Sequence, residues 1–189
     1  MNPKEIKLIT LGNSKVGKSS FILRYTENEF SIHISTTIGI DYKYKYETLD
    51  DGERVKIIIF DTNGQERFKS ISYNMLKNAN GVLLFYDICD KESFDSIKEW
   101  MESIYDIKEI NFPIVLIGNK IDKNEDRVID TKTGESEAQK YNIKFFEISC
   151  KNAINIKEPI LYLISQISGV KNDNNIVLSP KKKKKKCCK

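Results

Sequence analysis

Residues 12–19 read GNSKVGKS, which fits the pattern Gly-x-x-x-x-Gly-Lys-Ser. This segment follows an apolar run typical of a buried strand, residues 6–11, and precedes a helical pattern at residues 18–26. Gly12 and Gly17 let the backbone curl so that its N–H groups converge on phosphate oxygens, and the start of a helix also favours anions. The pattern predicts a phosphate-binding loop made of Gly12, Asn13, Ser14, Lys15, Val16, Gly17, Lys18, Ser19 and Ser20.

Two side chains of this loop suit a nucleoside phosphate and its metal ion. Lys18 supplies a positive charge for the β- and γ-phosphates, and Ser19 offers a hydroxyl group to Mg²⁺. A glycine turn that binds nothing is the alternative interpretation. The strand before the loop and the helix after it are the context in which this motif binds phosphate, so we expect a magnesium nucleotide as the ligand.

A second group of polar residues ends another apolar run, IIIFDTNGQERF at residues 57–68. Asp61 stands at the end of the expected strand, where a carboxylate can act on the metal ion through a water. Gly64 has no side chain, so its N–H can approach a γ-phosphate, and Gln65 can orient the attacking water as the catalytic residue. A strand that leaves through a polar turn is the alternative, which the preceding phosphate-loop motif makes less attractive.

Two further segments indicate the base of the nucleotide. Asp122, in GNKID at residues 118–122, can accept hydrogen bonds from N1–H and the 2-amino group of guanine, which adenine lacks. Asn119 and Lys120 are expected to brace the base and the phosphate loop. EISCK at residues 147–151 offers backbone N–H groups to the guanine oxygen, and these belong to Ser149, Cys150 and Lys151. Each segment alone fits an ordinary polar turn, but their order along the chain predicts a guanine nucleotide.

The charge of the chain is unevenly distributed. Its 31 Lys and Arg outnumber its 27 Asp and Glu, but seven of the lysines lie in residues 181–189, which contain no acidic residue. Residues 1–180 therefore carry 24 basic and 27 acidic side chains. A nucleic-acid-binding domain is expected to be basic, so we expect no nucleic acid as a partner of the domain.

Cysteine usage and hydropathy bear on the compartment. The four cysteines form no Cys-x-x-Cys pair and the chain has one His, so we expect no zinc site. No apolar run approaches the roughly 18–20 residues that a membrane-spanning helix needs, and the N-terminus lacks a signal-peptide pattern. We expect the chain to be made and kept in the cytosol with free thiols.

Apolar runs typical of strands alternate with helical patterns along the chain. The expected strands cover residues 6–11, 38–49, 53–60, 81–87, 112–119 and 143–149. The expected helices cover residues 18–26, 66–78, 93–107, 133–141 and 153–167. This alternation predicts an α/β fold with a mostly parallel sheet covered on both faces, and the hairpin of the second and third strands adds one antiparallel strand. Ligands of such sheets bind at the carboxyl ends of the strands.

Together these motifs resemble those of the small GTPases, specifically the Rab family. The resemblance covers residues 4–168 and rests on GNSKVGKS, ISTTIGIDY at residues 34–42, DTNGQERF, NKID and EISCK. It implies the three-layer P-loop NTPase fold of small G proteins, with six strands and about five helices, in a GTPase domain at residues 1–168. It also implies a switch between GTP and GDP that hydrolyses GTP slowly and binds effectors on membranes in vesicle trafficking.

The resemblance assigns roles within two switch segments, residues 30–42 and 61–77, which order around the γ-phosphate and relax on hydrolysis. Thr37 would bind Mg²⁺ and report the γ-phosphate, and Phe30 would stack on the guanine. The effector surface would comprise Ile38, Gly39, Ile40, Asp41, Tyr42, Phe60 and Met75.

The chain departs from the Rab pattern at several positions. Phe60 and Asn63 give FDTNGQE where WDTAGQE is usual, and the larger, polar Asn63 raises the question of slowed hydrolysis or disturbed switching. Lys15 stands where Gly or Ala is frequent, and Ile34 replaces a common tyrosine. Cys150 replaces a usual Ala, and we expect it to be a small buried residue.

The resemblance also implies the partners of a Rab switch. These are a guanine-nucleotide exchange factor, a GTPase-activating protein, effectors, and a GDP-dissociation inhibitor or prenyl escort protein. No arginine lies in residues 25–53, so the first switch supplies none to the phosphates. We expect an intrinsic turnover on the order of 10⁻⁴ s⁻¹, accelerated by an arginine from a partner.

The C-terminal residues are expected to form a flexible tail, residues 169–189, in which a spacer precedes KKKKKKCCK. There is no C-a-a-X box, but Cys187 and Cys188 resemble the Rab double-geranylgeranyl signal. Lipids and lysines together would hold the protein on the anionic cytosolic face of a membrane. SPKKKKKK also fits a nuclear localisation signal, and an unmodified, solvated tail is a third interpretation.

Three other functions are alternatives to the Rab-like switch. Asn63 suggests a nucleotide-bound scaffold that hydrolyses GTP poorly, and the basic tail suggests a nuclear regulator of the Ran type. A P-loop kinase would require a lid segment and an acceptor pocket, and the sequence indicates neither. Asp122 also favours guanine over the adenine of ATP.

Overall fold

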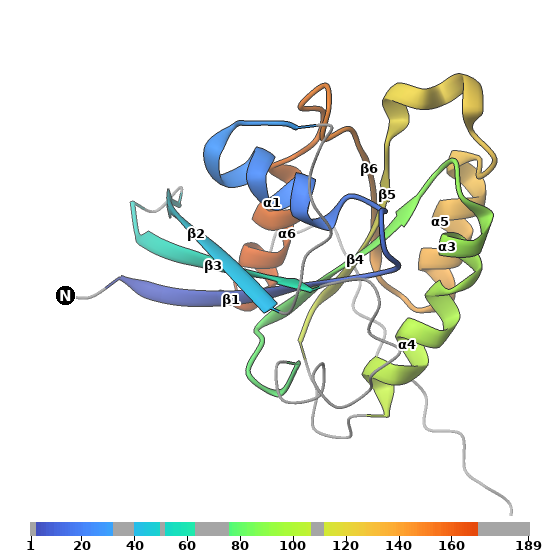
Figure 1. Cartoon of the computed structure of the whole chain (residues 1–189). Coiled ribbons are helices and arrows are strands. Elements are labelled where there is room, and N and C mark those ends of the chain that lie inside the picture. The colour runs from blue at the N-terminus through green and yellow to red at the C-terminus, as the bar shows by residue number, and fades with distance from the viewer. Residues whose placement is uncertain (1–2, 32–39, 50–51, 63–75, 107–111, 170–189) are drawn as a thin grey trace, which may run out of the picture.

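The computed structural model describes residues 3–31, 40–49, 52–62, 76–106 and 112–169, and its centre is one six-stranded sheet (Figure 1). The strands lie in the order β2-β3-β1-β4-β5-β6. Only β2 runs antiparallel, against β3, and the remaining pairs in the sheet are parallel. Their bounds are β1 Lys4–Leu11, β2 Ile40–Thr48, β3 Arg54–Thr62, β4 Gly81–Asp87, β5 Ile114–Asn119 and β6 Lys144–Ile148.

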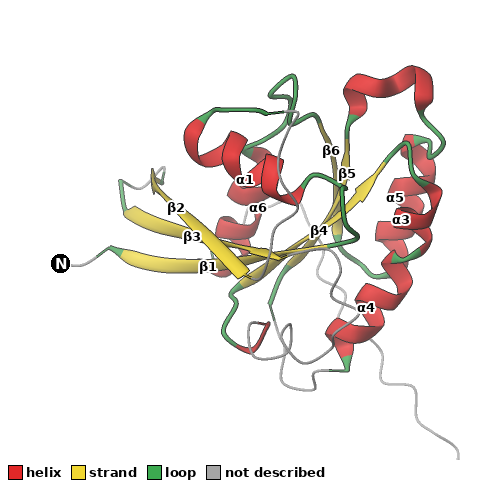
Figure 2. Ribbon diagram, viewed as in Figure 1, coloured by secondary structure: helices red, strands yellow, loops and turns green. Residues whose placement is uncertain are grey.

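Helices cover both faces of this sheet (Figure 2). The described helices are α1 Lys18–Glu27, α3 Lys91–Asp95, α4 Ile97–Tyr105, α5 Thr131–Lys140 and α6 Glu158–Ile167, with a 3₁₀ helix, η1, at Ile121–Asp126. α1 and α6 pack on one face, while α3, α4 and α5 lie on the other. The predicted α/β fold of three layers, with one antiparallel strand, is confirmed.

The strands divide their side chains between two cores because successive residues point to opposite faces. In β4, Leu83 and Phe85 join the core under α1 and α6, whereas Val82 and Leu84 join the core under α4 and α5. All seven residues of β4 are buried. Coverage on both faces explains why this strand is a continuous apolar run instead of an alternating one.

The parallel strands bring the predicted motifs to one edge of the sheet. β1 lies between β3 and β4, and β5 joins β4 to β6, so the carboxyl ends of these five strands are neighbours. The residues at these ends or directly next to them are Gly12, Asp61, Asp87, Asn119 and Ser149. Three of these positions were predicted from the sequence to bind the nucleotide and Asp61 to bind the metal ion through a water, whereas Asp87 was not predicted.

Two helix predictions were wrong in part. The expected helix at residues 153–167 begins only at Glu158, because Ala153 and Asn155 have φ angles of 56° and 54° and Ile154 forms a β-bridge with Ser149. Left-handed residues of this kind cannot continue an α-helix.

The expected helix at residues 93–107 is two helices, α3 and α4, joined at Ser96. At that junction the Ser96 hydroxyl donates to the Glu92 carbonyl at 2.8 Å. Most of the expected helix at residues 66–78 lies outside the described residues. Residue 107, the last of the helix expected at residues 93–107, lies outside them as well.

Candidate guanine-nucleotide site

The loop between β1 and α1 is curled by residues in left-handed backbone conformations. Gly12, Lys15 and Gly17 have φ angles of 128°, 66° and 101°. A Cβ atom on Gly12 would lie 2.2 Å from the carbonyl oxygen of Phe85, and one on Gly17 would lie 2.2 Å from Nδ2 of Asn119. Glycine is therefore required at both positions, because a side chain would clash with the neighbouring atoms and because the φ angle is positive. Successive N–H groups in such a loop form an anion-binding concavity.

Lys18 lies inside this curl and is 5% exposed. Its Nζ donates hydrogen bonds to the carbonyl oxygens of Gly12 and Asn13, at 2.8 and 2.9 Å. The side chain thus caps the loop from within, where its charge would stabilise an anion bound by the backbone amides. Ser14, Val16 and Ser20 belong to the same segment of loop and helix start.

The side chain of Asn13 points away from the loop, toward the α3–α4 junction. Nε1 of Trp100 donates to Oδ1 of Asn13 at 3.0 Å, and Nδ2 of Asn13 donates to the Ser96 hydroxyl at 3.0 Å. This anchor was not predicted from the sequence, because Asn13 and Trp100 are 87 residues apart. The backbone of Asn13 remains the predicted phosphate-binding group.

Asn119 joins the two ends of the site and is 1% exposed. Its Nδ2 donates to the carbonyl oxygen of Val16 at 2.8 Å, and its Oδ1 accepts from the N–H groups of Lys120 and Cys150 at 2.7 and 3.4 Å. One amide side chain therefore holds the phosphate loop against the EISCK segment. This geometry fits the bracing role that the sequence suggested for Asn119.

Lys120 is placed by a residue that the sequence analysis missed. Its Nζ lies 2.6 Å from Oδ2 of Asp87, the last residue of β4, and its φ angle of 73° turns the chain into η1. Oδ1 of Asp87 accepts from the N–H of Cys89 at 3.0 Å. An acidic residue at the end of a neighbouring parallel strand was the signal that could have revealed Asp87.

Asp122 and Ser149 meet although they come from different loops. The Ser149 hydroxyl donates to Oδ1 of Asp122 at 2.6 Å and accepts from the N–H of Asn152 at 3.0 Å. The carboxylate is therefore oriented by a buried serine, since Ser149 is 0% exposed. Oriented acceptors of this kind are what recognition of a base edge by hydrogen bonds requires.

Cys150 and Phe30 are the remaining residues of the predicted guanine end of the site. Cys150 is 3% exposed, and this burial raises the pKa of its thiol to about 12. The expectation of a small, buried residue at position 150 is confirmed. Phe30 is half-buried against the α1 and α6 core, and the guanidinium of Arg24 lies 5.9 Å from the centre of its ring. Lys151 is exposed beside them.

Two of the three predicted magnesium ligands are described. Ser19 is near the start of α1, and Asp61 is 7% exposed at the end of β3. The β1 and β3 ends are tied together, because the Thr62 hydroxyl donates to the carbonyl oxygen of Thr10 at 2.7 Å. A hydroxyl and a carboxylate are hard oxygen donors that suit Mg²⁺, which usually takes few protein ligands. The residues present therefore fit this ion.

Part of the predicted effector surface is described on β2 and β3. Tyr42 is 59% exposed, and its ring centre lies 6.0 Å from that of Phe60 across the strand pair. The carboxylate of Asp41 accepts from the N–H of Tyr42 at 2.8 Å. Of Ile40 only the backbone is described, paired with Thr62.

Several predicted residues lie outside the described part of the chain. These are Thr37, Ile38, Gly39, Gly64, Gln65, Met75, Cys187 and Cys188, together with Ile34 and Asn63.

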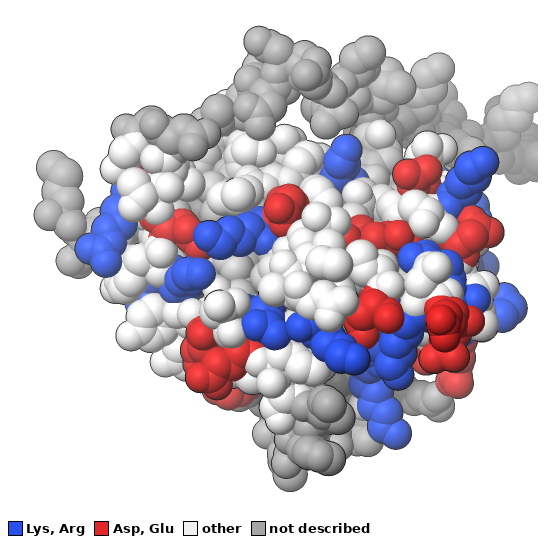
Figure 3. Space-filling view, turned by 90° about the horizontal axis from the view of Figure 1, so that it is seen from above, with Lys and Arg blue, Asp and Glu red and all other residues white. Residues whose placement is uncertain are grey.

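Among the described residues, no helix combines the length and the apolar character that crossing a membrane demands. On the face seen from above, basic and acidic side chains are interspersed (Figure 3).

Comparisons with known proteins identify the family. A sequence model of the Ras family matches residues 7–169. "Ras-related protein Rab-8B" of Dictyostelium discoideum is 40% identical, over 97% of this chain and 93% of its own length. "GTP-binding protein ypt2" of Schizosaccharomyces pombe is 38% identical, over 97% and 96% respectively. "Ras-related protein Rab-3C" of Bos taurus is 38% identical, over 85% and 70%. The chain therefore belongs to the Ras family and is a Rab-like small GTPase.

Proposed function

We propose that this chain is a switch, on in the GTP form and off in the GDP form, that recruits effectors to the cytosolic face of a membrane in vesicle trafficking. The observation that carries the proposal is the position of Asn119, whose side chain joins the phosphate loop to the EISCK segment. A single bound nucleotide would therefore contact both segments at once, with its phosphates at one and its base at the other.

Asp122 would select guanine. Its Oδ1 already accepts the Ser149 hydroxyl, which fixes the plane of the carboxylate. N1–H and the 2-amino group of guanine would donate to this carboxylate, whereas adenine would leave it without donors. Leaving such an acceptor without partners costs about 1–3 kcal/mol, which supports rejection of ATP.

The phosphates would lie in the loop of residues 12–20. Lys18 would balance the charge of the β- and γ-phosphates, and Gly64 would contribute its N–H to the γ-phosphate. Ser19, Thr37 and, through a water, Asp61 would hold Mg²⁺, which supplies charge neutralisation at the phosphates when it is bound. Gln65 would orient the water for in-line attack.

The partners proposed are those of a Rab switch. An exchange factor would load GTP, and a GTPase-activating protein would supply the arginine that residues 25–53 lack. A GDP-dissociation inhibitor or prenyl escort protein would carry the lipidated form. Effectors would bind the surface that includes Tyr42 and Phe60, whose aromatic rings are partly or largely accessible.

The tail would be the membrane anchor. We propose a GTPase domain at residues 1–168 and a tail at residues 169–189 in which Cys187 and Cys188 carry the lipids. Two lipid chains, or one chain with a basic segment, are needed for stable membrane binding. The lysines of residues 181–186 would favour an anionic cytosolic leaflet.

A single-turnover assay tests the enzymatic part of this proposal. The purified protein is loaded with GTP and Mg²⁺, and the bound nucleotide is followed by chromatography, with ATP loading as a control. Slow conversion of bound GTP to GDP, with no retention of ATP, is the expected result. Bound GTP that is never converted would instead indicate a hydrolysis-impaired scaffold, and retained ATP would contradict guanine recognition.

Asp122→Asn is the matched variant for that assay. The asparagine keeps an Oδ1 acceptor for the Ser149 hydroxyl, so the loop contact is retained. Its amide nitrogen would donate to the 2-oxo group of xanthine but has no acceptor to offer the 2-amino group of guanine. We expect this variant to lose GTP and to retain XTP.

A further inference from the structure

Arg24, in the last turn of α1, contacts two segments around the guanine end of the site, the EISCK loop and the chain that follows α1. Its Nε donates to the carbonyl oxygen of Cys150 at 2.8 Å, and one terminal nitrogen donates to that of Lys151 at 3.1 Å. The other terminal nitrogen donates to the carbonyl oxygen of Asn28 at 2.8 Å. The guanidinium also lies 5.9 Å from the ring centre of Phe30.

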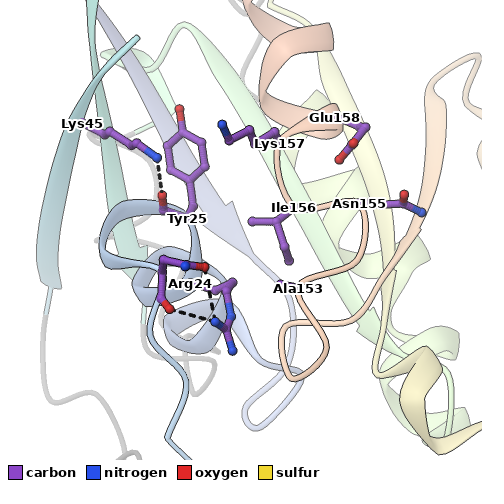
Figure 4. A pocket seen from close by; sticks show the side chains of 9 residues that line it. Arg24, Tyr25, Lys45, Ala153, Asn155, Ile156, Lys157 and Glu158 are labelled. Atoms are coloured by element: carbon purple, nitrogen blue, oxygen red, sulfur yellow. Dashed lines mark hydrogen bonds between the residues drawn. The ribbon is translucent and has the colours of Figure 1, made fainter.

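We propose that Arg24 is a positioning residue for the guanine base, which orients the N–H groups of the EISCK loop and thereby slows nucleotide release. The inference rests on the proposed guanine site, and it concerns a residue outside that site. Arg24 lines a cavity of about 470 Å³ between α1, β2 and residues 153–158 (Figure 4).

The argument follows from the planarity of the peptide bond. In a trans peptide the C=O of one residue and the N–H of the next lie in one plane and point in opposite directions. The bond from Arg24 to the Cys150 carbonyl therefore fixes the direction of the Lys151 N–H. That N–H is one of the groups that the sequence predicts for the guanine oxygen.

The second peptide plane leads to Asp122. The bond from Arg24 to the Lys151 carbonyl fixes the direction of the Asn152 N–H, which donates to the Ser149 hydroxyl at 3.0 Å. Ser149 in turn donates to Oδ1 of Asp122 at 2.6 Å. Hydrogen bonds of 2.6–3.1 Å and rigid peptide planes thus connect Arg24 to both features proposed to recognise the base, the Lys151 N–H and the Asp122 carboxylate.

Only an arginine can make this arrangement at position 24. Its planar guanidinium presents several N–H donors in a fixed fork, so it can hold two successive carbonyls of the loop and the end of α1 together. A lysine would retain the charge at the carboxyl end of α1, where a cation is favourable, but its single ammonium group lacks the fork.

The test measures nucleotide release from the full-length protein in Arg24→Gln and Arg24→Lys variants. Two probes are compared, GDP and the 5′-diphosphate of 2-aminopurine riboside, which lacks both the 6-oxygen and the N1–H of guanine. Lys157→Gln is the matched control, because Lys157 lines the same cavity and carries a charge but is not part of the guanine site. Release is followed by stopped-flow exchange, and thermal unfolding of each loaded variant is recorded.

We expect both Arg24 variants to release GDP about tenfold faster, because a tenfold change corresponds to the loss of roughly one net hydrogen bond. We expect them to release the analogue less than about twofold faster. The analogue has neither the 6-oxygen nor the N1–H and keeps only the 2-amino contact to Asp122, so misdirecting the loop N–H groups costs it little compared with GDP. The Lys157 control should leave both rates unchanged.

Two results would overturn the proposal. An equal acceleration of both probes would assign Arg24 a structural role only, and GDP release at the wild-type rate in both variants would assign it none. These failures are distinct from failure of the proposed function, in which the wild-type protein would not retain GDP at all. If Arg24→Gln fails to fold, the ratio of the two rates in Arg24→Lys decides the question.

Discussion

At the scale of single residues, the buried side chain of Tyr86 is placed by packing and not by hydrogen bonding. It is 0% exposed, and its ring centre lies 5.1 Å from that of Phe94 and 6.4 Å from that of Phe145. Its hydroxyl has no hydrogen-bond partner among the described residues, and burial raises the pKa of the phenol. Cβ atoms on Gly118 and Gly134 would lie 2.7 and 2.5 Å from that hydroxyl.

Replacing Tyr86 by Phe should therefore stabilise the protein. We expect Tyr86→Phe to raise the free energy of unfolding by about 1 kcal/mol, because a buried hydroxyl without a partner costs desolvation energy. Urea unfolding of the GDP-loaded protein measures the change. Gly134→Ala is the contrasting variant and should lower stability through its contact with the hydroxyl. A decrease in stability in Tyr86→Phe would show that the hydroxyl has a partner in solution.

At the scale of elements, the phosphate loop is held from the side by the α3–α4 junction. Asn13 accepts from Trp100 and donates to Ser96, both at 3.0 Å, and Ser96 donates on to the Glu92 carbonyl at 2.8 Å. A helix that lies outside the nucleotide-binding motifs therefore contributes to the shape of the loop. Trp100 is also the single tryptophan of the chain, so its fluorescence reports on this contact.

Removing the Asn13 side chain should change the fluorescence and loosen the loop together. We expect Asn13→Ala to shift the emission maximum of Trp100 and to raise the GDP release rate about threefold, since one or two part-buried hydrogen bonds are lost. Asn13→Gln keeps an amide acceptor and donor without adding a charge to the phosphate loop, and it should change release less than twofold. An unchanged emission maximum in Asn13→Ala would mean that the indole does not depend on this bond.

At the scale of the whole molecule, α6 is the last element of the core. Ile160, Leu163 and Ile164 of this helix are at most 2% exposed and pack with α1 against the sheet. The helix is followed by Ser168 as its C-cap and by Gly169 with a φ angle of 70°. The packed domain can therefore be complete before the basic tail begins.

Shortening the chain after Gly169 should separate folding from membrane attachment. We expect the shortened protein to retain GDP and a thermal midpoint within about 2 °C of the full chain, because every core residue that the structure describes is kept. In cells it should leave the membrane fraction, and so should the full chain with Cys187→Ser and Cys188→Ser. If the double serine variant stays on membranes, the lipid anchor is wrong and the lysines or a partner hold the protein there.

The sequence predicted more of the sheet than of the connections. The strand at residues 81–87 agrees with β4 at both ends, because a covered parallel strand is a continuous apolar run with clear limits. The helix expected from residue 153 starts five residues later, at Glu158. The apolar spacing wrongly predicted a helix over residues 153–157. Ala153 and Asn155 have left-handed backbone angles, but neither residue type indicates the end of a helix as strongly as a glycine does.

The sequence by itself determined the family and the layer order, and it predicted the place of the nucleotide site. Each motif follows a strand, and parallel strands bring their carboxyl ends to one edge of a sheet whatever the loops between them do. Only the tertiary structure decided that Lys120 pairs with Asp87, that Asn13 faces Trp100 and that Arg24 holds the EISCK loop. These contacts join residues 33 to 126 positions apart in the chain. Side chains so distant in sequence meet according to how helices pack on the sheet, which no local pattern of residues encodes.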